Sequence, residues 1–294
     1  MIDDSVPPFE LARHARLMGV ERQLAHRFSR GELVRVRAGV YLATDLWNAL
    51  DADARHRAQV FAAAEVLRPD TVFSHDSAAA MLRLPGLGRW PATVSVVGAA
   101  ASGGRSSRAV HRLSRATDPD AVDINQFAVT SLPRTVIDMA ATAPFGRAVC
   151  MVDAALRRSE NGEFRRVHGI RATDTPSLLG LLARLAPFPG VARAKLAIEF
   201  GDGLSGSIGE SISRVNMHLA DFPPPQLQVP FYDSDGLIGY TDFYWPDIRV
   251  IGEFDGRVKY GNATYARGRL PEEVVWAEKL REDRLRAQVR SLAR

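Results

Sequence analysis

The stretch 239–260 constrains the fold of this chain most, because its residue pattern predicts a β-hairpin. Residues 240–245 alternate in character and are rich in aromatic side chains, and residues 248–254 are rich in β-branched ones. The Pro-Asp pair at 246–247 between them favours a tight turn. The C-terminal part of the chain is therefore expected to contain a sheet built around this hairpin.

The predicted hairpin places several carboxylate side chains close together. Side chains alternate across a strand, so Glu253 and Asp255 share one face, and the turn places Asp242 across the ladder from them. Like charges repel, and a bound divalent cation is the usual compensation for such a cluster. Lys259 follows within reach of the same patch. An ordinary Asp-Gly turn is the alternative interpretation of this run.

Length and composition are typical of a soluble multidomain protein. The 294 residues suffice for two or three domains, 46% are hydrophobic and 24% are charged, and no apolar run reaches the length of a membrane span. The N-terminus shows no basic and apolar leader, so we expect no signal peptide. A single cysteine, Cys150, excludes a disulfide framework and a Cys-based zinc site. These features predict a cytoplasmic protein without a membrane partner.

Residues 9–42 predict a small basic unit. Two short helices are expected over 9–18 and 21–29, and residues 33–42 alternate like a two-stranded hairpin that turns near Ala38 and Gly39. Two short helices followed by a β-ribbon are typical of a winged helix-turn-helix. From Ala12 to Leu42, seven arginines against two glutamates leave a charge of +5, more than the +4 of the whole chain.

A basic winged helix predicts DNA as the partner. We expect Arg22, Gln23 and Arg27 to face the major groove from the second helix. Arg35 and Arg37 alternate along the wing, so both are expected on the side where phosphates or the minor groove lie. A solvated basic face on a small helical domain is the alternative interpretation.

This first unit, which closes its wing with Gly39-Val40-Tyr41, resembles the N-terminal winged-helix domain of AbiEi-type antitoxins. The patterns Ser-His-x-Ser-Ala-Ala at 74–79 and Thr-Ser-x-x-Arg-Thr-x-x-Asp at 130–138 extend the resemblance to about residue 158. It implies a DNA-binding protein that often represses its own operon, and a nucleotidyltransferase-like toxin as the cognate partner. The middle region would serve as a scaffold or contact the toxin. A homodimer suits a repressor that reads a palindrome.

Two features of the middle region have structural interpretations. His75 is expected to be a buried, hydrogen-bonded histidine, because no acid or nucleophile is spaced to serve it in catalysis. Arg134 and Asp138 stand four residues apart and predict an ion pair along a helix.

The C-terminal unit carries a long ordered set of motifs. They are Ser-x-Gly-Glu-Ser-x-x-Arg from 207, Gln-Val from 228, Asp-Phe-x-Trp-Pro from 242, Glu-Phe-Asp-Gly-x-x-Lys-Tyr from 253 and Glu-Lys-x-Arg-Glu-Asp-x-Leu-Arg from 278. The set is similar to the very-short-patch-repair-like branch of the PD-(D/E)xK, restriction-endonuclease-like fold. The resemblance implies metal-dependent hydrolysis of DNA phosphodiester bonds. Glu210 matches the acid of the first helix, Asp242 the strand acid, and Glu253 and Asp255 the paired positions on the next strand.

The same resemblance implies roles for these side chains. Asp242 and Glu253 would hold Mg²⁺ or Mn²⁺, and Glu210 would complete or orient that shell. Lys259 would stabilise the anionic transition state or help to position the nucleophile. Two features depart from the family. Asp255 stands where its members usually carry Lys, and the chain ends at Arg294, where they often continue into another strand. A missing edge strand would weaken the sheet or leave an open edge.

The patterns together predict an α/β, multidomain α+β chain. A winged-helix DNA-binding domain is expected over 1–50, a mixed α/β middle domain over 51–158, a helical bridge over 159–200 and an endonuclease-like α/β sandwich over 201–294. Two functions stay open at this point. The chain is a nuclease that a winged helix delivers to DNA, or it is an AbiEi-like antitoxin and repressor with a degenerate nuclease-like unit. Intact metal-binding acids favour the first, and acids held apart or neutralised by arginine favour the second.

Overall fold

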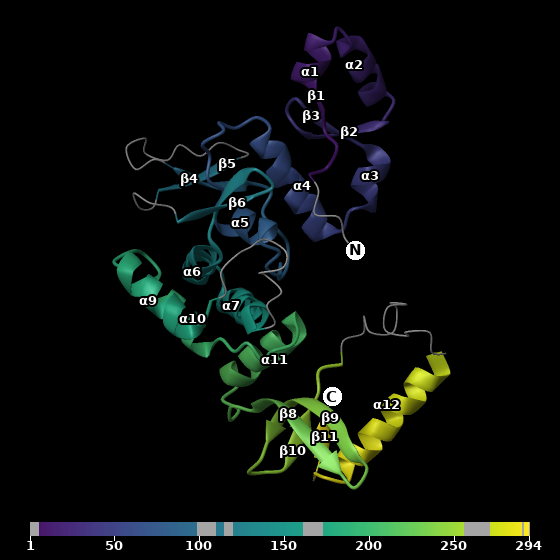
Figure 1. The fold of residues 1–294 in the computed structure, drawn as a ribbon, viewed down its shortest axis with the longest axis vertical. Helices are drawn as coiled ribbons and strands as arrows, with labels where there is room; N and C mark the ends of the chain where they lie inside the picture. Colours follow the sequence, from purple (N-terminus) through teal and green to yellow (C-terminus); the bar gives the residue numbers. More distant parts are fainter. Residues whose placement is uncertain are drawn as a thin grey trace. The chain divides into compact units, whose positions relative to one another are not determined.

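The computed structural model describes residues 6–98, 110–114, 120–160, 173–255, 271–289 and 291–293. The chain is a mixture of helices and small sheets, as predicted, and divides into two compact units, Met1–Gly201 and Asp202–Arg294 (Figure 1). Among the described residues, none of the helices combines the length and the apolar character that crossing a bilayer requires.

The first unit begins with two helices and a three-stranded sheet. The elements are β1 (Glu10–Leu11), α1 (Ala12–Leu17), α2 (Glu21–Ser29), β2 (Leu33–Arg37) and β3 (Val40–Ala43). The strands pair antiparallel in the order β1-β3-β2. The second helix and the hairpin are confirmed. The first helix is shorter than predicted, because the residues that precede it pair with β3 instead.

Two further helices follow, α3 (Thr44–Ala49) and α4 (Ala52–Ala64). Asp51 caps α4, because its side chain accepts a hydrogen bond from the backbone N–H of Ala54 at 2.7 Å. Ala62 of α4 is buried against Leu11 and Val40. The small N-terminal sheet therefore shares its core with α4.

The rest of the first unit is largely helical. Its elements are α5 (His75–Met81), β4 (Val94–Gly98), β5 (Val110–Ser114), β6 (Ala121–Ile124), β7 (Phe127–Thr130), α6 (Leu132–Thr142), α7 (Phe145–Glu160), α9 (Thr175–Leu185) and α10 (Val191–Phe200). Strands β4 and β5 are parallel, and β6 and β7 form a hairpin. Phe73 bridges to both β4 and β7.

The two structural interpretations in the middle region are confirmed. His75 is buried, and its Nδ1 lies 3.1 Å from the hydroxyl of Ser74. Arg134 Nε donates to both carboxylate oxygens of Asp138, at 3.1 and 3.2 Å. Both side chains of this pair are almost fully buried, which the spacing alone did not predict.

The described part of the second unit contains a four-stranded sheet and the helices α11 and α12. Its elements are α11 (Ile208–Leu219), β8 (Gln226–Asp233), β9 (Gly236–Trp245), β10 (Val250–Gly252), α12 (Pro271–Arg286) and β11 (Ser291–Ala293). The strand order is β11-β10-β9-β8. The hairpin of β9 and β10 is confirmed, with its turn between Trp245 and Val250. Strand β11 follows α12 and pairs parallel with β10.

Candidate functional site

The acidic patch of the second unit is assembled from one helix and two strands. Glu210 lies in the first turn of α11, which Ser207 caps by accepting the backbone N–H of Glu210 at 3.2 Å. Gly252 of β10 pairs with Phe243 of β9. Continuing this register by one residue makes Asp242 and Glu253 cross-strand neighbours, which is the arrangement predicted from the hairpin.

Gln228 of β8 joins two of these acids. Its side-chain amide donates to Glu210 Oε2 at 3.3 Å and to Asp242 Oδ1 at 3.4 Å. Backbone N–H groups supply the stronger contacts: Gly206 donates to Glu210 Oε2 at 2.6 Å, and Phe254 donates to Asp242 Oδ2 at 2.8 Å. The backbone of Gln228 has φ +49°, a strained conformation for a non-glycine residue.

The sequence analysis did not name Gln228 as a site residue. Its only signal was the Gln-Val pair among the C-terminal motifs. The structure places this amide between the carboxylates of Glu210 and Asp242, where it satisfies oxygens that a metal ion would otherwise need to coordinate.

Glu253 is held by a guanidinium from α12. Arg281 Nη2 lies 2.7 Å from Glu253 Oε1, and Arg281 Nη1 lies 3.3 Å from Glu253 Oε2. Arg281 Nη2 also donates to the carbonyl oxygen of Tyr240 at 2.8 Å. One turn further along α12, Arg284 donates two hydrogen bonds to the carboxylate of Asp233, and this contact lowers the pKa of the Asp233 carboxyl. Two arginines therefore fasten α12 to the sheet through carboxylates.

The described residues do not fit a Mg²⁺ or Mn²⁺ site. Both oxygens of Glu253 accept hydrogen bonds from Arg281, whose positive charge neutralises the carboxylate without a metal. Within the described ranges, no three Asp, Glu, His or Cys side chains gather closely enough to hold a metal ion. Asp255 is exposed, and Lys259 lies outside the described residues. The predicted convergence of carboxylates on a cation is thus not found among the described side chains, and no metal-dependent step follows from this arrangement.

The N-terminal arginines fall into two groups. Four of the seven between residues 12 and 42 are engaged with glutamates. The ion pairs are Arg13 with Glu65 at 2.6 Å, Arg16 with Glu21 at 3.0 Å, Arg27 with Glu10 at 2.6 Å and Glu32 at 3.4 Å, and Arg30 with Glu32 at 3.1 Å. The hydrogen bond that Arg27 donates to the Glu10 carboxylate raises the pKa of Arg27. Most of the positive charge counted in the sequence is therefore neutralised locally.

Three arginines remain. In the part of the chain that the structure describes, Arg22, Arg35 and Arg37 form no ion pair. Arg22 is exposed on α2, and the guanidinium carbon of Arg35 lies 5.9 Å from the centre of the Phe28 ring. Arg37 is partly buried, which lowers its pKa. Strand β2 has a bulge between Arg35 and Arg37, so the regular alternation from which we predicted a common side is interrupted.

One side of α2 borders a pocket. Gln23 and Arg27 line this pocket together with Leu24, and Gln23 is also exposed. On a helix, His26 lies one turn from Arg22, and both are exposed. His26 was not among the residues predicted to contact DNA. Helical spacing could have found it, because Leu24 marks the inward face of α2 and His26 lies nearly opposite.

Comparisons with known proteins reveal distant similarity. No protein-family model matches the chain. Over 123 residues the chain is 28% identical to two proteins of Mycobacterium tuberculosis, "Uncharacterized protein Rv2248" of strain ATCC 25618 / H37Rv and "Uncharacterized protein MT2308" of strain CDC 1551 / Oshkosh. The match covers 41% of this chain and 40% of each relative, so it spans less than half the length of either protein.

Proposed function

We propose that this chain is a DNA-binding regulator that contacts DNA through a winged helix-turn-helix formed by α1, α2, β2 and β3. The observation that carries the proposal is the set of arginines without ion pairs: Arg22 on α2, and Arg35 and Arg37 on the hairpin. Four neighbouring arginines have their charge neutralised by glutamates, so these three hold the net positive charge that phosphates would attract.

The packing of α2 supports this assignment. The ring of Phe28 meets Tyr41 of β3 edge to face, with centroids 5.4 Å apart. This contact fixes the helix against the hairpin, and Arg35 lies over the same ring. The helix and the wing therefore present their arginines as one unit, as a module that contacts a groove and the flanking phosphates requires.

The second unit supports repression rather than cleavage. Its acids are engaged by Gln228, by backbone N–H groups and by Arg281, which is the arrangement expected of a degenerate nuclease-like domain. We therefore propose an AbiEi-like antitoxin and repressor. Its C-terminal unit resembles the very-short-patch-repair-like fold and serves as a binding platform. A nucleotidyltransferase-like toxin would be its partner, and a homodimer would read a palindromic operator in the cytoplasm.

The test measures DNA affinity at several salt concentrations. A fluorescent duplex that spans the DNA upstream of its own gene is titrated with protein, and the affinity is read by anisotropy. Three phosphate contacts per chain predict a slope of log K against log salt of about −2.7, and Arg22→Ala or Arg35→Ala should each reduce it by about 0.9. Arg16→Ala is the matched control, because Arg16 is already paired with Glu21. Equal slopes for Arg22→Ala and Arg16→Ala would refute the assignment.

DNA cleavage is the second candidate, because Asp242 and Glu253 are cross-strand neighbours and Gln228 connects Asp242 to Glu210. Plasmid and short duplex DNA are incubated with Mg²⁺ or Mn²⁺ and either the wild type or Glu253→Ala. We expect salt-sensitive binding and no cleavage from either protein. Metal-dependent nicking that disappears in the variant would instead establish a nuclease and would require Arg281 to leave Glu253.

A further inference from the structure

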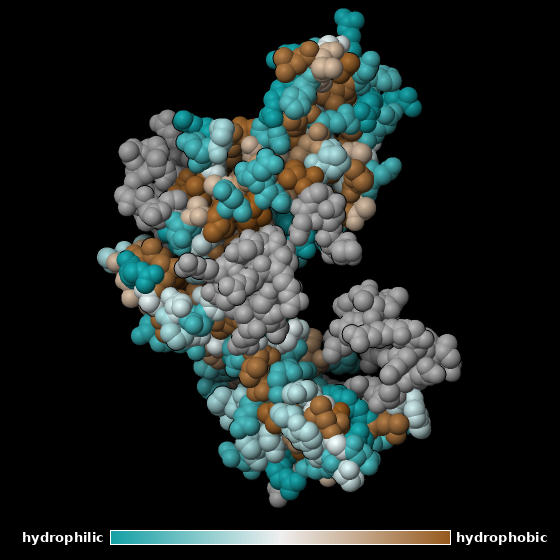
Figure 2. Space-filling view, in the orientation of Figure 1, coloured by the Kyte–Doolittle hydropathy of each residue, from teal (hydrophilic) through white to brown (hydrophobic). Residues whose placement is uncertain are grey.

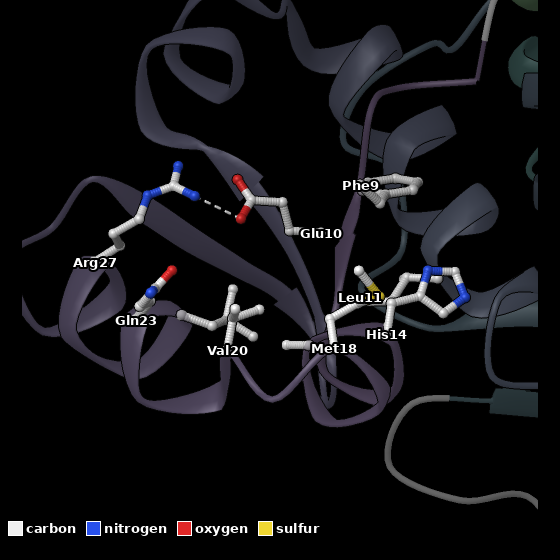
Figure 3. Close-up of a pocket in the computed structure, with 10 residues that line it drawn as sticks. Phe9, Glu10, Leu11, His14, Met18, Val20, Gln23 and Arg27 are labelled. Carbon is white, nitrogen blue, oxygen red and sulfur yellow. Dashed lines mark hydrogen bonds and ion pairs between the residues drawn. The ribbon is translucent and has the colours of Figure 1, made fainter.

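A pocket lies directly behind α2. Its volume is about 300 Å³, which is the lower end of the range for small-molecule sites. Strand β1, α1 and α2 all contribute to its lining: Phe9, Glu10, Leu11, His14, Ala15, Met18, Val20, Gln23, Leu24 and Arg27. Figure 3 shows Glu10, Arg27 and Gln23 toward one side, and Phe9 and His14 on the other. The pocket is thus mostly apolar, with its charged groups at one end.

Glu10 and Arg27 are the charged residues of the lining, and Arg27 Nε also lies 3.4 Å from Glu32 Oε2, which does not line the pocket. Arg27 Nη1 donates to Glu10 Oε2 at 2.6 Å. Among the described residues, Arg27 Nη2 donates no hydrogen bond and Glu10 Oε1 accepts none. Arg27 Nη2 can therefore donate a hydrogen bond to an anionic group of a ligand, and Glu10 Oε1 can accept one from a cationic group.

We propose that this pocket binds an α-amino acid with an apolar side chain. The ligand carboxylate would take the free N–H groups of Arg27, and its ammonium group would take the free oxygen of Glu10. The apolar side chain would lie against Leu11, Val20 and Leu24.

A zwitterion fits this pair better than a singly charged ligand does. A plain carboxylic acid would bring a second negative charge beside Glu10, and a plain amine would bring a second positive charge beside Arg27. The zwitterion gives each group a partner of opposite charge and leaves the total charge of the site unchanged.

Occupancy of the pocket would regulate DNA binding, and this part rests on the proposed function. Gln23, Leu24 and Arg27 belong to α2, whose outer face carries Arg22. A ligand that bridges Glu10 of β1 and Arg27 of α2 fixes the position of α2. The affinity for DNA would then change, because α2 would meet DNA in the conformation that the ligand stabilises.

The first experiment measures binding of L-leucine to the full chain. Met18 lines the pocket and is 77% exposed. Figure 2 shows hydrophobic surface next to hydrophilic surface where Figure 1 draws α1 and α2. The ¹³C-methyl signal of Met18, assigned with Met18→Leu, is followed by NMR during titration with L-leucine, 4-methylpentanoate and 3-methylbutylamine. We expect a saturable shift with L-leucine. The other two probes, which each lack one charged group, should bind at least about 10-fold more weakly.

Variants test the contacts. Arg27→Gln and Glu10→Gln should each weaken L-leucine binding at least about 10-fold. Arg16→Gln is the matched control, because it breaks an ion pair with Glu21 and neither residue lines the pocket. Val20→Phe fills the pocket and should abolish the shift while the thermal unfolding temperature stays within a few degrees of the wild type.

Several outcomes would overturn the inference. An unmoved Met18 signal at saturating L-leucine, equal binding of either singly charged probe, or an unchanged affinity in Arg27→Gln would each do so. A Met18 shift that follows protein concentration without ligand would instead assign the pocket to a second copy of the chain. The proposed function is judged separately, by anisotropy. If the chain binds L-leucine but not DNA, the proposed pocket stands and the proposed DNA-binding function is refuted. If it binds DNA but not L-leucine, only the proposed DNA-binding function stands.

Discussion

The ion pair between Arg281 and Glu253 makes a quantitative prediction about the second unit. The pair joins α12 to the end of β10, and its side chains are 26% and 10% exposed. We compare it with Arg286 and Glu282 on the same helix, whose side chains are 60% and 18% exposed. The perturbations are Arg281→Gln, Glu253→Gln and the double variant, with the equivalent three variants for the control pair.

The expected coupling energies differ because burial differs. A fully buried pair costs about 3–5 kcal/mol when one partner is removed, and an i,i+4 pair on an exposed helix contributes about 0.3–0.5 kcal/mol. Arg281 is partly exposed, so we expect a coupling of about 2 kcal/mol for its two hydrogen bonds to Glu253. The control pair should give less than about 0.5 kcal/mol.

Double-mutant cycles measure these couplings. The chain has four tryptophans, and Trp245 and Trp276 belong to the second unit. Labelling with 5-fluorotryptophan gives separate ¹⁹F signals, so urea unfolding of the second unit is followed independently of the first. Equal couplings for the two pairs would refute the reasoning. It would show that Arg281 does not specifically neutralise Glu253, and the acidic patch would again be available to a cation.

Two further predictions concern the first unit. Burial lowers the pKa of His56 to about 4. Between pH 6.5 and pH 4 the unfolded chain protonates this histidine and the folded chain does not, so the free energy of unfolding should fall by about 3 kcal/mol over that range and stay constant above it. In His56→Phe the denaturant midpoint should depend less on pH over that range. The same pH dependence as in the wild type would contradict the assignment. At Gly190, which has φ +91°, an added Cβ would strike the carbonyl of Ala141, whereas at Gly88, with φ +81°, it would meet open space. Gly190→Ala should therefore destabilise the unit by about 2 kcal/mol more than Gly88→Ala, measured by thermal unfolding, and equal losses would argue against this contact.

The sequence by itself determined the elements whose signals are local. The hairpin of β9 and β10, the helix over 21–29 and the turn at Gly39 were all predicted, because alternation, helical spacing and turn chemistry lie within a few residues of one another. The neighbourhood of Asp242 and Glu253 followed from the same local register. The mixed α/β character of the chain followed from the order of these elements.

Tertiary structure alone decided which charges remain available. Three contacts join residues that are far apart in the sequence. Arg281 donates to Glu253 across 28 positions, Arg27 donates to Glu10 across 17, and Gln228 donates to Glu210 across 18. No local pattern encodes these contacts, because they depend on how separate elements pack. They turn an apparent cluster of carboxylates into a neutralised one, and an apparent excess of seven arginines into three that are free of ion pairs within the described structure.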